Sequence, residues 1–121
     1  MTRKQARPGK RQDSDVPIQL PYPADAPERV ARALRALSAP TRVVTLRHLL
    51  SHDSATPAEI IESTAATAVH PALIELERLG FVTGDIPAGA RQGKAVRYSL
   101  NRAELRTCLD EMRAWMVPAE D

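Results

Sequence analysis

The sequence predicts a mainly α-helical domain with a small β-hairpin, arranged as a winged helix-turn-helix. Three observations favour this class. Aromatic residues make up only 3% of the 121 residues, so leucine, valine, isoleucine and alanine must form the core, which favours packed helices. Four segments before Gly80 place apolar residues at helical spacing. After Gly80 the spacing changes to a period of two, and a last helical segment follows.

The first two helices are predicted from this spacing and from a proline. One helix is expected over residues 26–37. Pro40 suits the first turn of a second helix, which is expected to end near Leu50. The arginines of the first helix, Arg29, Arg32 and Arg35, are expected on solvated faces. The residues expected to face inward are Val30, Ala33, Leu34, Leu37, Val43, Leu46, Leu49 and Leu50.

A helix-turn-helix is predicted next. Thr56 and Glu59 form a capping box with Pro57 just inside it, and they open a short helix that buries Ile60 and Ile61. The small polar residues 63–67 are expected to turn. A further helix places Val69, Leu73, Leu76 and Leu79 on one face and ends at Gly80.

The wing and the final helix complete the prediction. Phe81 and Val82 lead into a strand that ends near Pro87, residues 88–93 form a flexible loop, and a second strand carries Val96, Tyr98 and Leu100. Asn101 and Glu104 are expected to form a second capping box. The last helix runs to Met116, and its apolar stripe consists of Leu105, Cys108, Leu109, Met112, Trp115 and Met116.

Charge divides the chain into an arm and a body. Residues 1–11 hold five of the 17 basic residues and none of the 15 acidic ones, so the remainder carries a net charge of −3. Residues 1–24 also hold four prolines and few apolar positions, which predicts a disordered basic arm. Residues 25–117 are expected to form the domain, with the dimerisation helices at its two ends, and residues 118–121 a tail.

Composition excludes several function classes. The single Cys108 cannot form an intrachain disulfide and is expected to be a buried thiol. No apolar run is long enough for a membrane span, and no apolar segment follows the charged N-terminus as in a signal peptide, so a cytoplasmic location is expected. No phosphate loop, catalytic triad or nucleotide fingerprint occurs, so neither an enzyme nor a cofactor is predicted.

Three segments resemble the ArsR-like transcriptional regulators. Leu34–Arg42 looks like that family's opening, Leu73–Val82 like the end of its recognition helix and first wing strand, and Arg91–Lys94 with Val96–Leu100 like its wing. The resemblance covers residues 27–116. It implies a homodimer, joined through its first and last helices, that binds operator DNA. It departs from the family's metal sensors, because the recognition region has no Cys and the last helix has no His.

The DNA contacts are predicted on the arm, the second helix, the recognition helix and the wing. Ala68 and Ala72 suit a thymine methyl, and Thr67, His70 and Arg78 suit bases or phosphates. Equally, His70 could be a plain capping residue. The predicted DNA-contacting residues are Arg3, Lys4, Arg7, Arg42, Thr67, Ala68, His70, Ala72, Arg78, Arg91, Lys94 and Arg97.

The recognition region is unusually acidic, which leaves an alternative open. Six acids lie from Asp53 to Asp85, with only Arg78 as a base. Either Glu75 and Glu77 face away from DNA, or this surface binds a protein. A protein-interaction module is therefore the second hypothesis, and a subunit of an enzyme or replication complex ranks last.

The outer helices are predicted to dimerise, because methionine and tryptophan are enriched at protein interfaces. The other interpretation is that they only close the monomer core. The residues assigned to the dimer interface are Val30, Leu34, Leu105, Leu109, Met112, Trp115 and Met116.

His48 and His52 have a metal-ligand spacing but no third ligand, so no metal site is predicted. His52 is expected to lie beyond the helix end and to pair with free carbonyls there.

Overall fold

The computed structural model describes residues 25–117, which form five helices and a two-stranded antiparallel sheet. The predicted class, mainly helical with a small hairpin, is confirmed. The basic arm (residues 1–24, with Arg3, Lys4 and Arg7) and the tail (residues 118–121) lie outside the described residues. The elements are α1 (Glu28–Ala36), α2 (Pro40–Leu50), α3 (Pro57–Thr64), α4 (Val69–Arg78), β1 (Val82–Gly84), β2 (Tyr98–Leu100) and α5 (Arg102–Met116).

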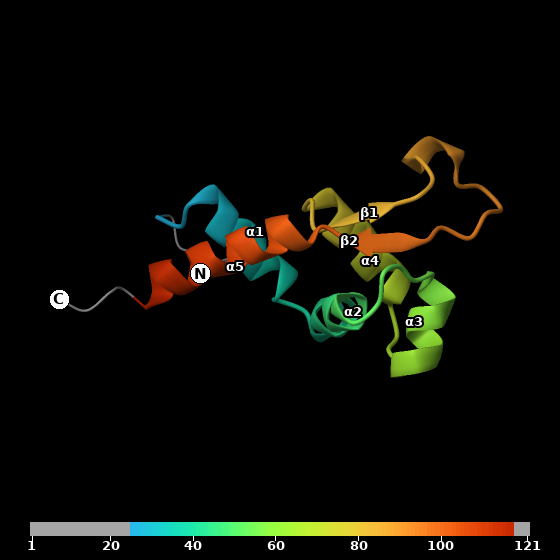
Figure 1. The fold of residues 1–121 in the computed structure, drawn as a ribbon, viewed down its shortest axis with the longest axis horizontal. Helices are drawn as coiled ribbons and strands as arrows, with labels where there is room; N and C mark the ends of the chain where they lie inside the picture. The colour runs from blue at the N-terminus through green and yellow to red at the C-terminus, as the bar shows by residue number, and fades with distance from the viewer. Residues whose placement is uncertain (1–24, 118–121) are drawn as a thin grey trace, which may run out of the picture.

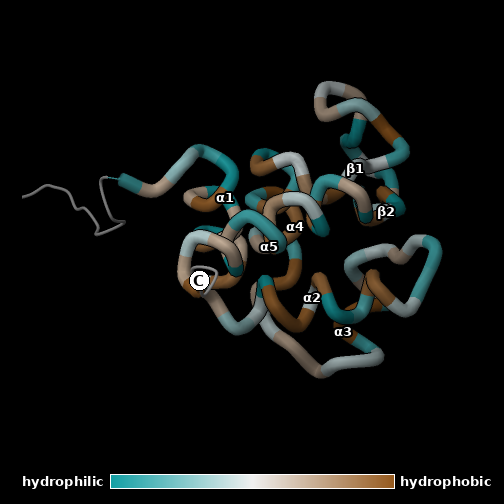
Figure 2. Tube along the Cα trace, turned by 60° about the vertical axis from the view of Figure 1, so that its left-hand side comes forward, coloured by the Kyte–Doolittle hydropathy of each residue, from teal (hydrophilic) through white to brown (hydrophobic). Residues whose placement is uncertain are grey.

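The outer helices and the hairpin lie at opposite ends of the molecule (Figure 1). At one end α5 packs along α1, and Arg29 of α1 pairs with Glu111 of α5 at 3.0 Å. At the other end β1 and β2 project beyond α4. Between the two ends α2, α3 and α4 pack on one another. Hydrophobic and hydrophilic residues are both present along the helices (Figure 2).

The start of α3 is set by local sequence, as predicted. The Thr56 hydroxyl accepts a hydrogen bond from the Glu59 amide at 3.2 Å, and the Glu59 carboxylate accepts one from the Thr56 amide at 3.1 Å. Pro57 occupies the first helical position, where no amide donor is needed. The capping box is thus confirmed.

The turn between α3 and α4 has two alanines in the left-handed region. Ala65 has φ 57° and Ala68 has φ 59°, a conformation that costs a residue with a Cβ about 1–2 kcal/mol. Ala68 is the N-cap of α4 and has no side chain that can bond the first amides. His70 lies inside the helix, so the interpretation of His70 as a cap is wrong. The first turn of α4 therefore begins without a side-chain cap.

A single core joins all five helices and the hairpin. Its members are Ala33, Ala36, Leu46, Leu49, Ala55, Ile60, Val69, Leu73, Leu76, Leu79, Phe81, Val82, Val96, Tyr98, Leu105 and Cys108. Cys108 is buried as expected, and burial raises the pKa of its thiol. Ala55 pairs with Tyr98 through two backbone hydrogen bonds of 2.8 and 3.0 Å, which attaches the start of α3 to the hairpin.

Three residues expected inside α2 and α3 lie on the surface instead. Val43 is 39% exposed, Leu50 49% and Ile61 45%. The reason is helical phase. The face of α2 that packs on the core carries Thr45, Leu46 and Leu49, and Val43 and Leu50 lie seven residues apart on a neighbouring stripe. In the eight-residue α3 only Ile60 is buried.

The second capping box is not formed. The Asn101 amide donates to the Gly80 carbonyl at 2.7 Å, and its carbonyl oxygen accepts from the Thr83 hydroxyl at 3.0 Å. Glu104 pairs with Arg32 of α1. Arg32 also donates to the Leu79 carbonyl and is only 21% exposed, so the expectation of a solvated face for Arg32 is wrong. Partners from distant segments replace the local cap.

The hairpin is shorter and its loop more ordered than predicted. Its register pairs Val82 with Leu100, Thr83 with Ser99 and Gly84 with Tyr98. The loop holds a 3₁₀ turn at Ala88–Ala90. The Arg91 guanidinium then donates back to the Ile86 carbonyl at 2.7 Å. The base of this loop is therefore fixed to the strands.

Thr45 in α2 carries a buried hydroxyl group without a hydrogen-bond partner among the described residues. Thr45 is fully buried, and its hydroxyl oxygen forms no hydrogen bond. Since an unpaired buried hydroxyl is destabilising, Thr45→Val is expected to raise the free energy of unfolding by about 1 kcal/mol. Urea denaturation measures the change, and Thr107→Val on the exposed side of α5 is the control. A loss of stability in the Thr45 variant would show that the hydroxyl is bonded in the native protein.

Candidate nucleic-acid interface

The first turn of α2 lies against the turn that precedes α4. The Thr41 hydroxyl donates to the Thr67 carbonyl at 3.2 Å, which joins segments 26 residues apart. Beside it, Arg42 donates to the Arg35 carbonyl at 2.8 Å and to the Ser38 hydroxyl at 3.1 Å. Within residues 25–117 no carboxylate lies at ion-pair distance from Arg42. Arg42 thus has a fixed position and keeps its charge available.

The outer face of α4 differs from the prediction at Ala72. Its exposed side chains are His70, Pro71, Ile74 and Arg78, and the preceding Thr67 and Ala68 are exposed as predicted. Ala72 is only 5% exposed, so its prediction as an outward DNA contact is wrong. Val69, Ala72, Leu73 and Leu76 share the buried face, since three- and four-residue steps return to one side of a helix.

Ile74 is the residue that the sequence analysis missed. Its side chain is 54% exposed, and the sequence had assigned it to neither face of the helix. The signal was in the sequence, because the buried positions 69, 73 and 76 fix the phase of the helix and place 74 outward, between positions 70 and 78.

Glu75 is balanced by arginines on one side of α4. Arg78 binds its carboxylate with two hydrogen bonds of 3.0 and 2.5 Å, and Arg35 of α1 lies 3.7 Å away. The hydrogen bonds of Arg78, with the nearby charges of Arg35 and Arg42, hold the pKa of Glu75 below its usual value. Glu75 therefore lies in a cluster of three arginines and does not present an unbalanced negative charge.

Glu77 is balanced on the other side of α4 by the wing. Arg91 binds its carboxylate with hydrogen bonds of 2.9 and 2.7 Å, and its guanidinium lies 5.6 Å from the centre of the Tyr98 ring. The Gly84 amide donates to the same carboxylate at 3.3 Å. A Cβ at Gly84 would come within 2.5 Å of the Arg91 guanidinium. Arg91 thus holds the wing against α4, although the sequence predicted that it lies in a flexible loop.

Removing the ion pair between Glu77 and Arg91 is expected to destabilise the fold. The Glu77 side chain is 28% exposed and that of Arg91 19%, so Glu77→Gln is expected to cost about 1–2 kcal/mol of unfolding free energy at neutral pH. The pairing lowers the pKa of Glu77 in the folded chain. The ion pair therefore stabilises the fold above the pKa that Glu77 has in the unfolded chain, and this stabilisation is lost as the pH falls through the pKa of the folded chain. Urea denaturation should therefore show a smaller difference between variant and wild type in acid.

Glu62→Gln provides the matched control for this substitution. Glu62 is an exposed glutamate on α3, and it forms no side-chain hydrogen bond or ion pair with another described residue. The control should change stability by less than about 0.5 kcal/mol at either pH. A Glu77 variant as stable as this control at neutral pH would show that the Arg91 pair does not hold the wing.

The remaining wing cations differ in how they are held. Arg97 binds the Glu59 carboxylate of α3 at 3.1 and 3.2 Å and the Ser54 hydroxyl at 3.0 Å. These hydrogen bonds lower the pKa of Glu59. Lys94 is exposed, and its side chain has no partner among residues 25–117. Lys94 is thus the wing cation that can approach an anion without first leaving a carboxylate.

A groove separates α4 from the wing. It has a volume of about 520 Å³, and Pro57 and Ala58 of α3 close one end. Ile74 and His70 of α4 form one wall. The other wall is the second arm of the hairpin, and the groove is lined there by Lys94, Ala95, Val96 and Tyr98. The ion-paired Glu77 and Arg91 also line the groove, so it combines apolar side chains with charged ones.

The face formed by α3, α4 and the hairpin has little net charge. From Thr56 to Leu100 the chain holds five carboxylates and four cationic side chains, a net charge of −1. Because three of the carboxylates are bound by arginines, neither sign of charge dominates. Strong attraction for a polyanion must come from residues outside this face.

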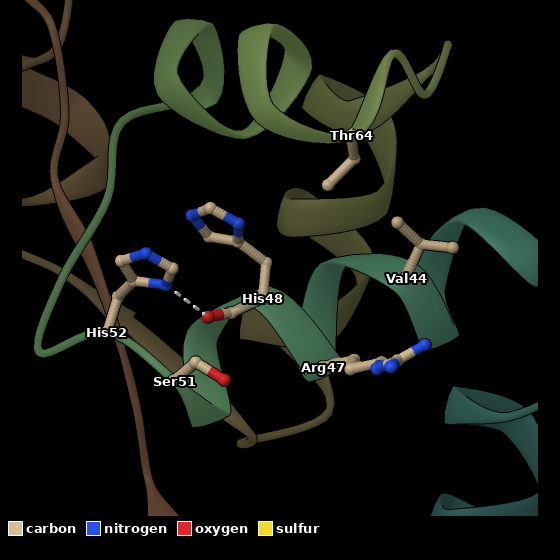
Figure 3. A pocket seen from close by; sticks show the side chains of 6 residues that line it. All are labelled: Val44, Arg47, His48, Ser51, His52 and Thr64. Carbon is tan, nitrogen blue, oxygen red and sulfur yellow. Dashed lines mark hydrogen bonds between the residues drawn. The ribbon is translucent and has the colours of Figure 1, made fainter.

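The histidine pair lies away from this face, between α2 and α3 (Figure 3). The His48 and His52 rings stack with centroids 4.0 Å apart, and Nδ1 of His52 lies 2.7 Å from the His48 carbonyl. The expectations that His52 follows the helix end and pairs with a carbonyl are confirmed. Burial and the neighbouring His52 lower the pKa of His48. Among the described residues no group of three His, Cys, Asp or Glu side chains is placed to hold a metal.

The residues assigned to the dimer interface fall into two groups. Val30 is 1% exposed and Leu105 4%, so both belong to the monomer core and their assignment is wrong. They fill the contact between α1 and α5. The partly or largely exposed residues are Leu34, Leu109, Met112, Trp115 and Met116. Leu37 and Val117 add further apolar surface at this end, so the expectation that Leu37 faces inward is wrong: it follows the last residue of α1 and is 37% exposed.

None of the helices in residues 25–117 has the length and apolar character needed to cross a bilayer. No family model matches the sequence, and no curated protein shows significant similarity to it.

Proposed function

We propose that this chain is a winged helix-turn-helix transcriptional regulator that binds operator DNA as a homodimer, acting as a repressor in the cytoplasm and not as an enzyme. The observation that carries the proposal is the contact between Thr41 and Thr67. It brings the first turn of α2, with Arg42, beside the exposed turn and outer face of α4. A helix that enters the major groove is commonly flanked by such backbone-contacting segments.

The chemistry of this surface suits a duplex. Neither α2 nor α4 has a side-chain cap, so the amide of Thr41 in α2 and those of Val69 and His70 in α4 remain for phosphate oxygens. Arg42 and Lys94 supply positive charge for the DNA backbone. Thr67 and His70 carry hydrogen-bonding groups at the end of α4 that would enter the groove first.

Affinity on this account comes from the edges of the interface. The central face has a net charge close to zero, whereas the first 11 residues add five positive charges. Basic arms bind phosphates and enter the minor groove beside a docked domain. The arm would therefore provide much of the attraction, and α4 the selectivity.

The outer helices would form the dimer. Leu34, Leu37, Trp115, Met116 and Val117 leave apolar side chains partly or largely exposed where α1 packs on α5. Methionine and tryptophan are residue types enriched at protein interfaces. A two-fold dimer would present two copies of α4 to half-sites about one helical turn apart.

A protein-binding module that uses an acidic face has less support. Glu59, Glu75 and Glu77 are each bound by an arginine of the same chain. A basic partner would have to break these pairs before it could use the carboxylates.

Selection from a random pool of duplex DNA tests the proposal, together with sedimentation of the free protein. The expected result is a pseudo-palindromic sequence with half-sites about 10 base pairs apart and a dimer at micromolar concentration. A failure to enrich any sequence would contradict the regulator function. A monomer would contradict the two-half-site arrangement.

A further inference from the structure

We infer that Ile74 determines sequence specificity by packing against the 5-methyl group of a thymine in each half-site. This inference rests on the proposed function and adds the kind of base that α4 selects. Ile74 is the large apolar side chain most exposed on α4, and it lies at the centre of the outer face.

The neighbouring charged groups of α4 are already bound within the chain. Arg78 is held by Glu75 through two hydrogen bonds, and Glu77 is held by Arg91 in the same manner. Reading a base with any of these groups would first require breaking an ion pair. Among the exposed side chains of α4 this leaves His70, Pro71 and Ile74.

The surroundings of Ile74 favour an apolar partner. It lines the groove between α4 and the hairpin together with the apolar residues Pro57, Ala58, Ala95 and Val96, and the charged residues of the same groove are Glu77, Arg91 and Lys94. A methyl group placed against Ile74 would cover apolar surface that is now exposed to water. The methyl group of thymine is the apolar group that base pairs present in the major groove, and cytosine and uracil lack it.

Thymine-to-uracil substitution tests the inference, because it removes the methyl group and keeps the base pairing. Each thymine of a selected duplex is replaced in turn, and the affinity of wild type and Ile74→Ala is measured by fluorescence anisotropy. Wild type is expected to lose about fourfold in affinity per half-site at one symmetric position. Ile74→Ala is expected to bind the thymine duplex more weakly and to show no further loss with uracil at that position.

Ile61→Ala is the matched control, since Ile61 is a similarly exposed isoleucine on α3 that does not line the groove. It should keep the full response to uracil. Thermal unfolding should be nearly unchanged in both variants, because both side chains are largely exposed. Selective DNA binding with no response to uracil in wild type, or an unchanged response in Ile74→Ala, would overturn the inference and leave the regulator function standing. Absence of any selective DNA binding would overturn both.

Discussion

Replacing Phe81 by alanine is expected to lower the free energy of unfolding by about 3–5 kcal/mol. The Phe81 ring is fully buried where α4 turns into β1. The Arg32 guanidinium lies 5.6 Å from its centre, so the ring also contacts the helix that pairs with α5. Since small domains are commonly stable by about 5–15 kcal/mol, this loss would leave the variant near its unfolding transition. Urea denaturation followed by circular dichroism measures it.

Two controls separate this effect from general sensitivity to truncation. Phe81→Leu keeps most of the apolar volume and should cost less than half as much. Val117→Ala removes methyl groups from a residue that is 63% exposed and should change stability by less than about 0.5 kcal/mol. A Phe81→Ala variant that loses less than about 1 kcal/mol would contradict the placement of this ring at the centre of the core.

Neutralising the arm is expected to cause the largest loss of DNA affinity. The variant replaces its five basic residues by glutamine, namely Arg3, Lys4, Arg7, Lys10 and Arg11. Each phosphate contact contributes about 0.9 to the slope of log affinity against log salt concentration. If most of the five side chains contact phosphates, the slope should fall by about 3–4 per protomer and affinity by at least tenfold at about 0.1 M salt.

A shuffled arm is the matched control for this variant. It keeps the composition and charge of residues 1–11 and changes only their order. Because phosphate neutralisation depends on the number of positive charges in the arm, the shuffled arm should bind nearly as well as wild type. If the glutamine variant keeps the wild-type slope, the arm takes no part in DNA binding.

Features determined by neighbouring residues were predictable from the sequence. The start of α3 follows from Thr56, Pro57 and Glu59, which are close in sequence and act on one another's amides. The same pattern at Asn101 and Glu104 failed, because Gly80 and Arg32 offer these side chains better partners from distant segments. A capping box can be predicted only where no tertiary contact competes for its side chains.

The ion pairs of the recognition region could not be predicted from the sequence either. The sequence counts the carboxylates near α4 but does not show which cations reach them. Arg91 lies 14 residues from Glu77, and Arg97 lies 38 residues from Glu59. These pairings depend on how the hairpin folds back onto α3 and α4. They turn an apparently acidic surface into a nearly neutral one, which removes most of the objection to a duplex.

The exposed face of α4 was predicted in part from the sequence. The buried residues Val69, Leu73 and Leu76 were recognised from their spacing, and they determine the phase of the whole helix. Ala72 was nevertheless placed outward and Ile74 was assigned to neither face. In the structure Ala72 is buried and Ile74 is exposed. The phase set by the three buried residues predicts both positions.

Comparison of selected and scrambled duplexes of equal length and base composition tests the central claim most directly. Equilibrium affinities of the full chain should be measured for both, at two salt concentrations. A sequence-specific regulator is expected to bind the selected duplex at least about 10³-fold more tightly, while affinity for both duplexes falls as salt rises. Equal affinities for the two duplexes would contradict the account, since a basic arm alone would then explain all of the binding.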